Sequence, residues 1–134
     1  MGLVAEKIIP GVVHDIYVLH ENDRCEMHDF IDELAQSNCN EHNKLISLLD
    51  RSASNGTPQN PEKFKRLQDR IYEFKTTGGI RVACFFDGRK VIILTQGFKK
   101  KKSYSEEIRR ALVLRVKYFD SKMNATLTLR GEDL

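Results

Sequence analysis

The sequence has 134 residues, 40% of them hydrophobic and 31% charged, which suits one globular domain and excludes collagen-like, low-complexity and fully disordered chains. Its longest apolar run, residues 82–86, is far shorter than the ~18 residues that span a bilayer, and three cysteines without a visible secretory signal favour a reducing cytoplasm. Residues 1–59 hold 4 Lys/Arg and 10 Asp/Glu, a net charge of −6, whereas residues 60–134 hold 18 Lys/Arg and 9 Asp/Glu, a net charge of +9. This asymmetry favours a polyanionic partner over basic residues that merely solvate the surface.

The first half of the chain predicts one strand followed by two helices. Residues 15–20 are β-branched and aromatic, which is typical of a strand. Asp23, with a glutamate three residues later, resembles a capping box that starts a helix with one apolar stripe. A second helix is expected to begin near Glu41 and to end at Gly56, which allows a left-handed backbone. These elements predict a helical hairpin on one face of a sheet.

The second half changes from helical spacing to two-residue alternation. Residues 70–75, 80–86 and 91–98 predict three antiparallel strands, joined first by a turn at 76–79 and then by a two-residue turn at Asp87-Gly88. The last two strands are apolar on both faces, as expected of central strands that helices cover.

The remaining segments complete an α+β chain with the order β-α-α-β-β-β-α and about four strands. Residues 62–66 suggest one helical turn, and Ser103 or Ser105 suits the start of a C-terminal helix. We expect a single domain over residues 1–134, with a core of about 13–122 and a tail from 123 to 134.

The histidines and cysteines do not indicate a catalytic or metal site in the basic half of the chain. All four histidines lie before residue 43, which disfavours a two-histidine ribonuclease mechanism at a basic site. Cys25 and His28, and again Cys39 and His42, share a C-x2-H spacing that superficially resembles a zinc site. The first pair belongs to an amphipathic helix that needs no metal to form. We therefore expect both pairs to be incidental, with no metal and no cofactor.

Arg81 stands out because it interrupts an apolar strand. A lone buried guanidinium is costly, so Arg81 should face solvent, a carboxylate such as Glu73 or Asp69, or a phosphate ligand. A two-residue turn at Asp87-Gly88 would set Arg81 opposite Leu94 and near the lysine run that follows the next strand.

Several short motifs, found at family-like spacing over residues 67–119, resemble the phage-derived HigB-like branch of the RelE/ParE toxin superfamily. Lys75 stands where this family usually has arginine, and Gln96 stands where histidine is common. The motifs are IYEFK at 71–75, IRV at 80–82, FF at 85–86, QGFKK at 96–100, and Glu107-Ile108 followed by Ala111.

The resemblance implies a RelE-like fold and the toxin of a type II toxin–antitoxin pair. Such a toxin is an mRNA interferase, a ribosome-dependent endoribonuclease that inhibits translation, and a cognate helix-turn-helix antitoxin protein inhibits it. Its partners would be mRNA on the ribosome and that antitoxin, and no membrane.

The implied mechanism is attack of a ribose 2′-OH on the adjacent phosphate, and it assigns roles to nine residues. Arg81 would contact the scissile phosphate, Lys100 and Lys101 would stabilise transition-state charge, and Glu73 would be the general base. Phe98 and Tyr104 would stack on bases, with a core role for Phe98 and a helix-start role for Tyr104 as the alternatives. The RNA backbone would be guided by Lys75, Lys99 and Lys102.

Two other functions fit the same pattern. One is a ParE-like toxin that binds a DNA topoisomerase without chemistry of its own. The other is an RNA-binding module that keeps the fold and has lost cleavage. A convergent phosphate site formed by Arg81 and the lysine run favours RNA cleavage over the first, because a protein-directed inhibitor has no need of it. The RNA-binding module would use the same cations, so these cations do not exclude it.

Overall fold

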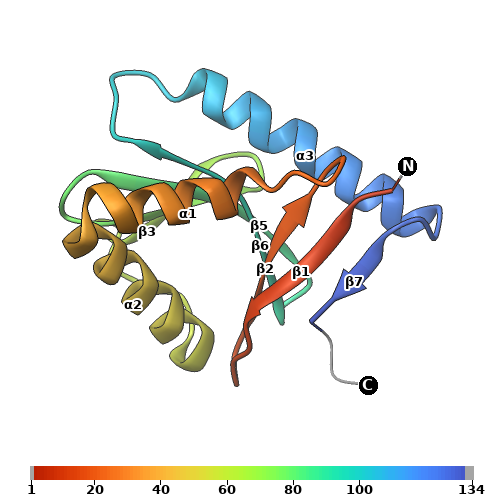
Figure 1. Ribbon diagram of the computed structural model, residues 1–134, viewed down its shortest axis with the longest axis horizontal. Helices are drawn as coiled ribbons and strands as arrows, with labels where there is room; N and C mark the ends of the chain where they lie inside the picture. Colours follow the sequence, from red (N-terminus) through yellow and green to blue (C-terminus); the bar gives the residue numbers. More distant parts are fainter. Residues whose placement is uncertain (1, 132–134) are drawn as a thin grey trace.

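A computed structural model describes residues 2–131 as one mixed sheet with helices on both faces (Figure 1). The sheet has seven strands in the order β3-β4-β5-β6-β2-β1-β7. The strands are β1 (Val4–Ile9), β2 (Asp15–His20), β3 (Phe64–Gln68), β4 (Ile71–Lys75), β5 (Ile80–Asp87), β6 (Val91–Lys99) and β7 (Thr128–Arg130), and the helices are α1 (Glu26–Ser37), α2 (Cys39–Asn55) and α3 (Ser105–Met123).

The predicted meander is confirmed. Strands β4, β5 and β6 pair antiparallel in chain order, and β2 joins the same sheet by pairing parallel with β6. The two-residue alternation of β5 and β6 sends apolar side chains to both faces, so both strands are buried through most of their length. The α+β class is therefore confirmed, whereas the expected sheet of about four strands is wrong.

Two apolar cores lie on opposite faces of the sheet. The first lies under α1 and α2 and includes Leu34 and Leu49, and the second lies under α3 and includes Phe85 and Tyr118. Close packing of α1 on β6 depends on Gly97, because an added Cβ would lie 2.2 Å from the Phe30 ring. The helical hairpin thus covers one face, as its apolar stripes predict, and α3 covers the other (Figure 1).

The hairpin between β5 and β6 differs from the predicted one. Asp87 pairs with Val91, so the loop has three residues. Farther along the hairpin, the pairing of β5 with β6 shifts by one residue between Cys84 and Ala83, as at a β-bulge. Together these shifts set Arg81 opposite Phe98 and not opposite Leu94. The Asp-Gly signal located the hairpin correctly but not its register, because loop length and bulges decide the register.

Three strands are absent from the predicted order. β1 pairs with β2 and β7, and its half-buried pattern gives no clean alternation. β3 is an edge strand with charged residues and stands where we expected a helical turn at 62–66. β7 lies within the expected tail and pairs parallel with β1, and residues 132–134 of that tail lie outside the described residues.

The helix boundaries also differ at their N-termini. Asp23 has a left-handed φ of 63° and is no cap; Cys25 is the N-cap of α1, where its Sγ accepts from the His28 N–H. The side chain of Asn38 caps α2, so α2 begins directly after α1. Gly56 ends α2 with a φ of 98°, as predicted. No helix within residues 2–131 is long and apolar enough to cross a membrane.

Candidate functional site

The end of the sheet next to the β4–β5 turn, residues 76–79, brings together the residues expected to bind phosphate. In the strand register, Arg81 lies opposite Lys75 on one neighbouring strand and opposite Phe98 on the other. The backbone N–H of Lys100 donates to the carbonyl of Gly79 at 2.7 Å, so the segment after β6 lies against this turn. Three strand ends and the lysine run therefore meet at one place.

Arg81 is buried on the α3 side of the sheet, with 6% of its surface exposed. Its Nη1 donates to the carbonyls of Thr76 at 3.1 Å and Ile80 at 3.0 Å, and its Nε lies 3.8 Å from Glu73 Oε1. Of the two carboxylates considered as partners, Glu73 lies beside Arg81. The guanidinium is thus held under the turn by backbone oxygens and one carboxylate.

Glu73 is 1% exposed and does not offer an accessible base. Burial raises the pKa of its carboxyl group, which the positive charges of Lys75 and Arg81 partly oppose. Its Oε1 has no hydrogen-bond partner, and neither has Arg81 Nε. The expected role of Glu73 as general base needs correction, because a carboxylate closed off from solvent cannot receive a proton directly from bound RNA.

A second polar cluster joins β6 to the start of α3. Gln96 is fully buried, and its Nε2 donates to the backbone oxygen of Glu107 at 2.8 Å and to its carboxylate at 3.1 Å. The same carboxylate accepts from Lys101 Nζ at 2.5 Å and lies 3.4 Å from Arg110. Lys101 is therefore an anchored residue, and the sequence-based assignment did not foresee its partner.

The cluster around Glu107, formed with Gln96, Lys101 and Arg110, makes the free energy of unfolding depend on pH. Burial alone would raise the pKa of Glu107, but hydrogen bonds from Lys101 and Gln96 outweigh it and hold the pKa below the usual 4.5. The stabilisation is thus present above about pH 4.5 and is lost as the pH falls through the lower folded value. We expect Glu107→Gln to lower the free energy of unfolding by about 1 kcal/mol at neutral pH and to flatten its decline in acid.

Urea unfolding at neutral and acidic pH measures this effect. Glu106→Gln is the matched control, since Glu106 is exposed and its ion pair with Arg109 on the same helix, which lowers its pKa, adds little to stability. Equal pH dependence of the Glu107→Gln variant and the unaltered protein would show that the cluster adds nothing.

The two aromatic residues lie at the positions that their alternative roles imply, in the core and at the start of α3. Phe98 is 7% exposed and packs in the core under α3, so its ring is closed to a base. Tyr104 is the N-cap residue of α3, and its ring lies edge-on to Phe98 with 5.3 Å between the centroids. Both rings therefore hold the start of α3 on the sheet.

Exposed cations flank the β4–β5 turn on two sides. Lys99, Lys100 and Lys102 are exposed on one side. On the other side, a groove of about 580 Å³ lies between α2 and the start of β3, and Lys75 lines it. Sequence reasoning missed the other cations of this groove, which come from distant segments: Lys44, Arg51 and Lys63.

The turn itself is anchored to α2 by a buried carboxylate. Glu41 is 5% exposed and accepts from Thr76 Oγ1 and from Lys44 Nζ. Gly78 allows this contact, because an added Cβ would lie 2.1 Å from the Glu41 carboxyl carbon. The hydrogen bond from Thr76 is the main cause that holds the pKa of Glu41 below its usual value. Glu41 thereby holds the groove and the turn in one arrangement.

Comparison with known proteins assigns the chain to a family. Residues 29–115 match the family described as Phage derived protein Gp49-like (DUF891). The chain belongs to this family. Gp49-like proteins are RelE-like toxins of toxin–antitoxin systems, which agrees with the superfamily that the sequence motifs resemble. No curated protein matches the chain.

The Gp49-like match covers the structural elements that build this site. It begins within α1 and ends within α3, and it includes all strands from β3 to β6. The groove, the β4–β5 turn and the lysine run thus belong to the Gp49-like part of the chain. Strands β1, β2 and β7 lie outside the match.

Proposed function

We propose that this protein is the HigB-like toxin of a type II toxin–antitoxin pair and acts as an mRNA interferase on the ribosome. The observation that supports this most is the arrangement of cations on both sides of the β4–β5 turn in a chain of the Gp49-like family. Phosphate contacts dominate the affinity of proteins for nucleic acids, and such contacts need exposed Lys and Arg in one region.

The proposed path of the RNA backbone runs across this turn. Lys75 sits half-buried at the edge of the groove, with Nζ 3.3 Å from the carbonyl of Pro61. Lys99, Lys100 and Lys102 extend the positive surface beyond the turn. The groove holds four cations against one carboxylate, Glu62. This excess of positive charge suits a single strand held through its phosphates.

Cleavage in this proposal is attack of the 2′-oxygen on the adjacent phosphorus. The 2′-hydroxyl loses its proton to water, the new O–P bond forms, and the bond to the 5′-oxygen breaks. The products are a 2′,3′-cyclic phosphate and a 5′-hydroxyl, which takes up a proton. Arg81 and Lys100 would stabilise the charge that develops on the phosphate, with Lys101 held nearby by Glu107.

Among the described residues 2–131, no histidine lines the groove. His20 and His28 bond to Glu6 on β1, and His42 bonds to its neighbour Asn43 on α2. Catalysis at the turn therefore relies on positioning and on preorganised positive charge. In this scheme Glu73 orients Arg81 and takes no proton.

One observation favours a second candidate function. Arg81 and Glu73 are both buried and lie beside each other, as a structural ion pair would. A module with this pair could bind RNA through its exposed lysines and lack cleavage. Binding and cleavage therefore have to be measured separately.

The proposal is tested by replacing the exposed lysines Lys99, Lys100 and Lys102 with alanine. We expect weaker binding to single-stranded RNA and to ribosomes, and a salt slope shallower by up to about 2, since each lost phosphate contact contributes ~0.7. The thermal midpoint should change little because these side chains are solvated. The matched control replaces three exposed arginines at the opposite end of the hairpin: Arg66, Arg70 and Arg89.

Mapping mRNA cut sites in a translation reaction, with and without ribosomes, completes the test. Cuts that require ribosomes support the interferase, and RNA binding without cuts supports the binding module. Inhibition of a topoisomerase with no effect on RNA would instead identify a ParE-like toxin. An unchanged salt slope in the lysine variant would contradict the proposed RNA surface.

The proposed inhibitor of the toxin is a helix-turn-helix antitoxin protein.

A further inference from the structure

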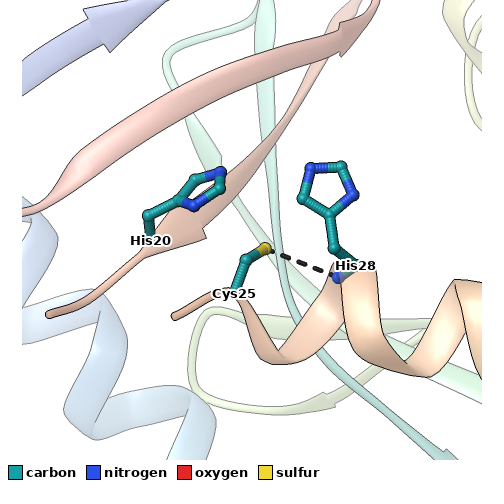
Figure 2. Close-up of side chains that lie close together, drawn as sticks. All are labelled: His20, Cys25 and His28. Carbon is teal, nitrogen blue, oxygen red and sulfur yellow. Dashed lines mark hydrogen bonds between the residues drawn. The ribbon is translucent and has the colours of Figure 1, made fainter. Parts of the chain in front are cut away.

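Four side chains with metal-binding atoms meet at the start of α1, away from the β4–β5 turn. His20 ends β2, Cys25 is the N-cap of α1, and His28 lies in the first turn of that helix (Figure 2). One ligand atom from each of these residues lies within 4.8 Å of the others. Glu6 on β1 joins them, because its Oε1 lies 2.7 Å from His20 Nε2 and 2.8 Å from His28 Nε2.

The fold explains why these residues meet. β1 and β2 are antiparallel with Val4 opposite His20, so Glu6 is the diagonal neighbour of His20 on the same face. The chain then reverses through a bridge in which Glu21 and Arg24 exchange two backbone hydrogen bonds. This reversal brings the N-terminus of α1 back beside the end of β2.

Both imidazoles direct Nε2 toward the same carboxylate oxygen. Their ring centroids are 5.5 Å apart, and the ring planes meet at 59°. The Cys25 thiol lies between the two rings in Figure 2, and its Sγ accepts a 3.4 Å hydrogen bond from the His28 N–H. The Glu6 oxygen thus lies between the two Nε2 atoms, and the Cys25 sulfur lies within 4.8 Å of a ring nitrogen of each histidine.

We propose that Glu6, His20, Cys25 and His28 bind one divalent transition-metal ion, with Zn²⁺ as the best fit. Zinc takes four ligands in a tetrahedron and accepts imidazole, thiolate and carboxylate together. Bond lengths of ~2.0–2.3 Å set ligand atoms roughly 3.3–3.7 Å apart, so shifts of about 1 Å bring the ligand atoms of His20, Cys25 and His28 to that spacing.

The surroundings suit capture of an ion from solution. Cys25 is 6% exposed, whereas 37% of the His28 side chain is exposed, which leaves one open side for the ion to enter. The Glu6 carboxylate lies within hydrogen-bond distance of both imidazoles, so this ligand is already positioned beside the other two. Zinc binds cysteine as the thiolate, so binding releases the proton of the Cys25 thiol.

The second C-x2-H pair shows that spacing alone does not make such a site. Cys39 is exposed, and its Sγ accepts from Asn43 Nδ2 at 3.7 Å. His42 bonds to the same Asn43. Within residues 2–131 no third ligand joins this pair, and it serves as a matched control. The proposed site lies before residue 29, outside the Gp49-like match, so this inference does not rest on the proposed toxin activity.

The test is titration of the full-length, chelator-treated protein with Co²⁺ and Zn²⁺. We expect one Co²⁺ per chain, with the visible bands of a tetrahedral ion and a near-ultraviolet thiolate charge-transfer band. Binding of either ion to the metal-free protein should release about one proton and raise the thermal midpoint, because the ion binds only the folded chain, and Zn²⁺ should displace bound Co²⁺.

Matched variants assign the ligands. Cys25→Ser keeps an N-cap acceptor, so it should stay folded while losing the charge-transfer band and weakening Zn²⁺ binding by at least tenfold. His28→Gln should weaken binding similarly, and Glu6→Gln less. Cys39→Ser and His42→Gln should bind like the unaltered protein. Absence of a stoichiometric Co²⁺ spectrum in the unaltered protein, or equal binding by Cys25→Ser, would overturn the proposal.

Discussion

Replacing Arg81 should lower the rate of mRNA cleavage by tens-fold or more. Arg81→Lys keeps the charge but lacks the planar pair of donors that the guanidinium offers a phosphate. One such contact to developing charge contributes ~3 kcal/mol to the barrier. RNA binding should weaken much less, because the contact strengthens as charge develops in the transition state. Single-turnover cleavage and RNA affinity, measured on the same preparations, test this expectation.

The buried position of Arg81 makes stability the essential control. Arg81→Ala removes the cation beside the buried Glu73 carboxylate, which costs about 3–5 kcal/mol when such a pair is broken. Replacing both partners with neutral Gln restores the thermal midpoint if the role is structural, and activity should then return with it. A catalytic role predicts a recovered midpoint without recovered cleavage. Unaltered cleavage rates in a folded Arg81→Ala protein would remove Arg81 from the mechanism.

Truncating Phe85 should cause a large loss of stability. Phe85 is fully buried on β5 and contacts Tyr118 and Phe119 of α3, with ring centroids 5.4 and 5.9 Å apart. Phe85→Ala removes these contacts and leaves a cavity, so the free energy of unfolding should fall by about 3–5 kcal/mol. Urea unfolding measures this value.

Phe85→Ala should also disturb the candidate site, because Phe85 packs against α3 and α3 carries Glu107. A weakened contact between α3 and the sheet should loosen the Lys101–Glu107 pair and expose the loop at 100–104 to protease. Val116→Ala is the control on the same helix, since Val116 is 57% exposed and its truncation should change stability by less than about 0.5 kcal/mol. A loss below 1 kcal/mol for Phe85→Ala would show that α3 is held mainly by other contacts.

Local pattern was sufficient to predict the central architecture. The apolar stripes of α1 and α2 and the uninterrupted apolar runs of β5 and β6 report burial directly, because a side chain's face follows from its position in the helix or strand. The turn before Ile80 and the stop at Gly56 follow from residues that favour those backbone conformations. The motifs of residues 67–119 were sufficient to indicate the RelE-like superfamily, and the Gp49-like match agrees with it.

The sequence by itself therefore determined the α+β class, the helical hairpin, the meander and the basic second half. Only the tertiary structure decided the register that sets Arg81 opposite Phe98, the groove with Lys44 and Arg51, and the cluster around Glu6. The physical reason is that these contacts join segments far apart in the chain. Loop length, a bulge and the pairing of weakly patterned strands set such contacts, and none of these leaves a periodic signal in the residues themselves.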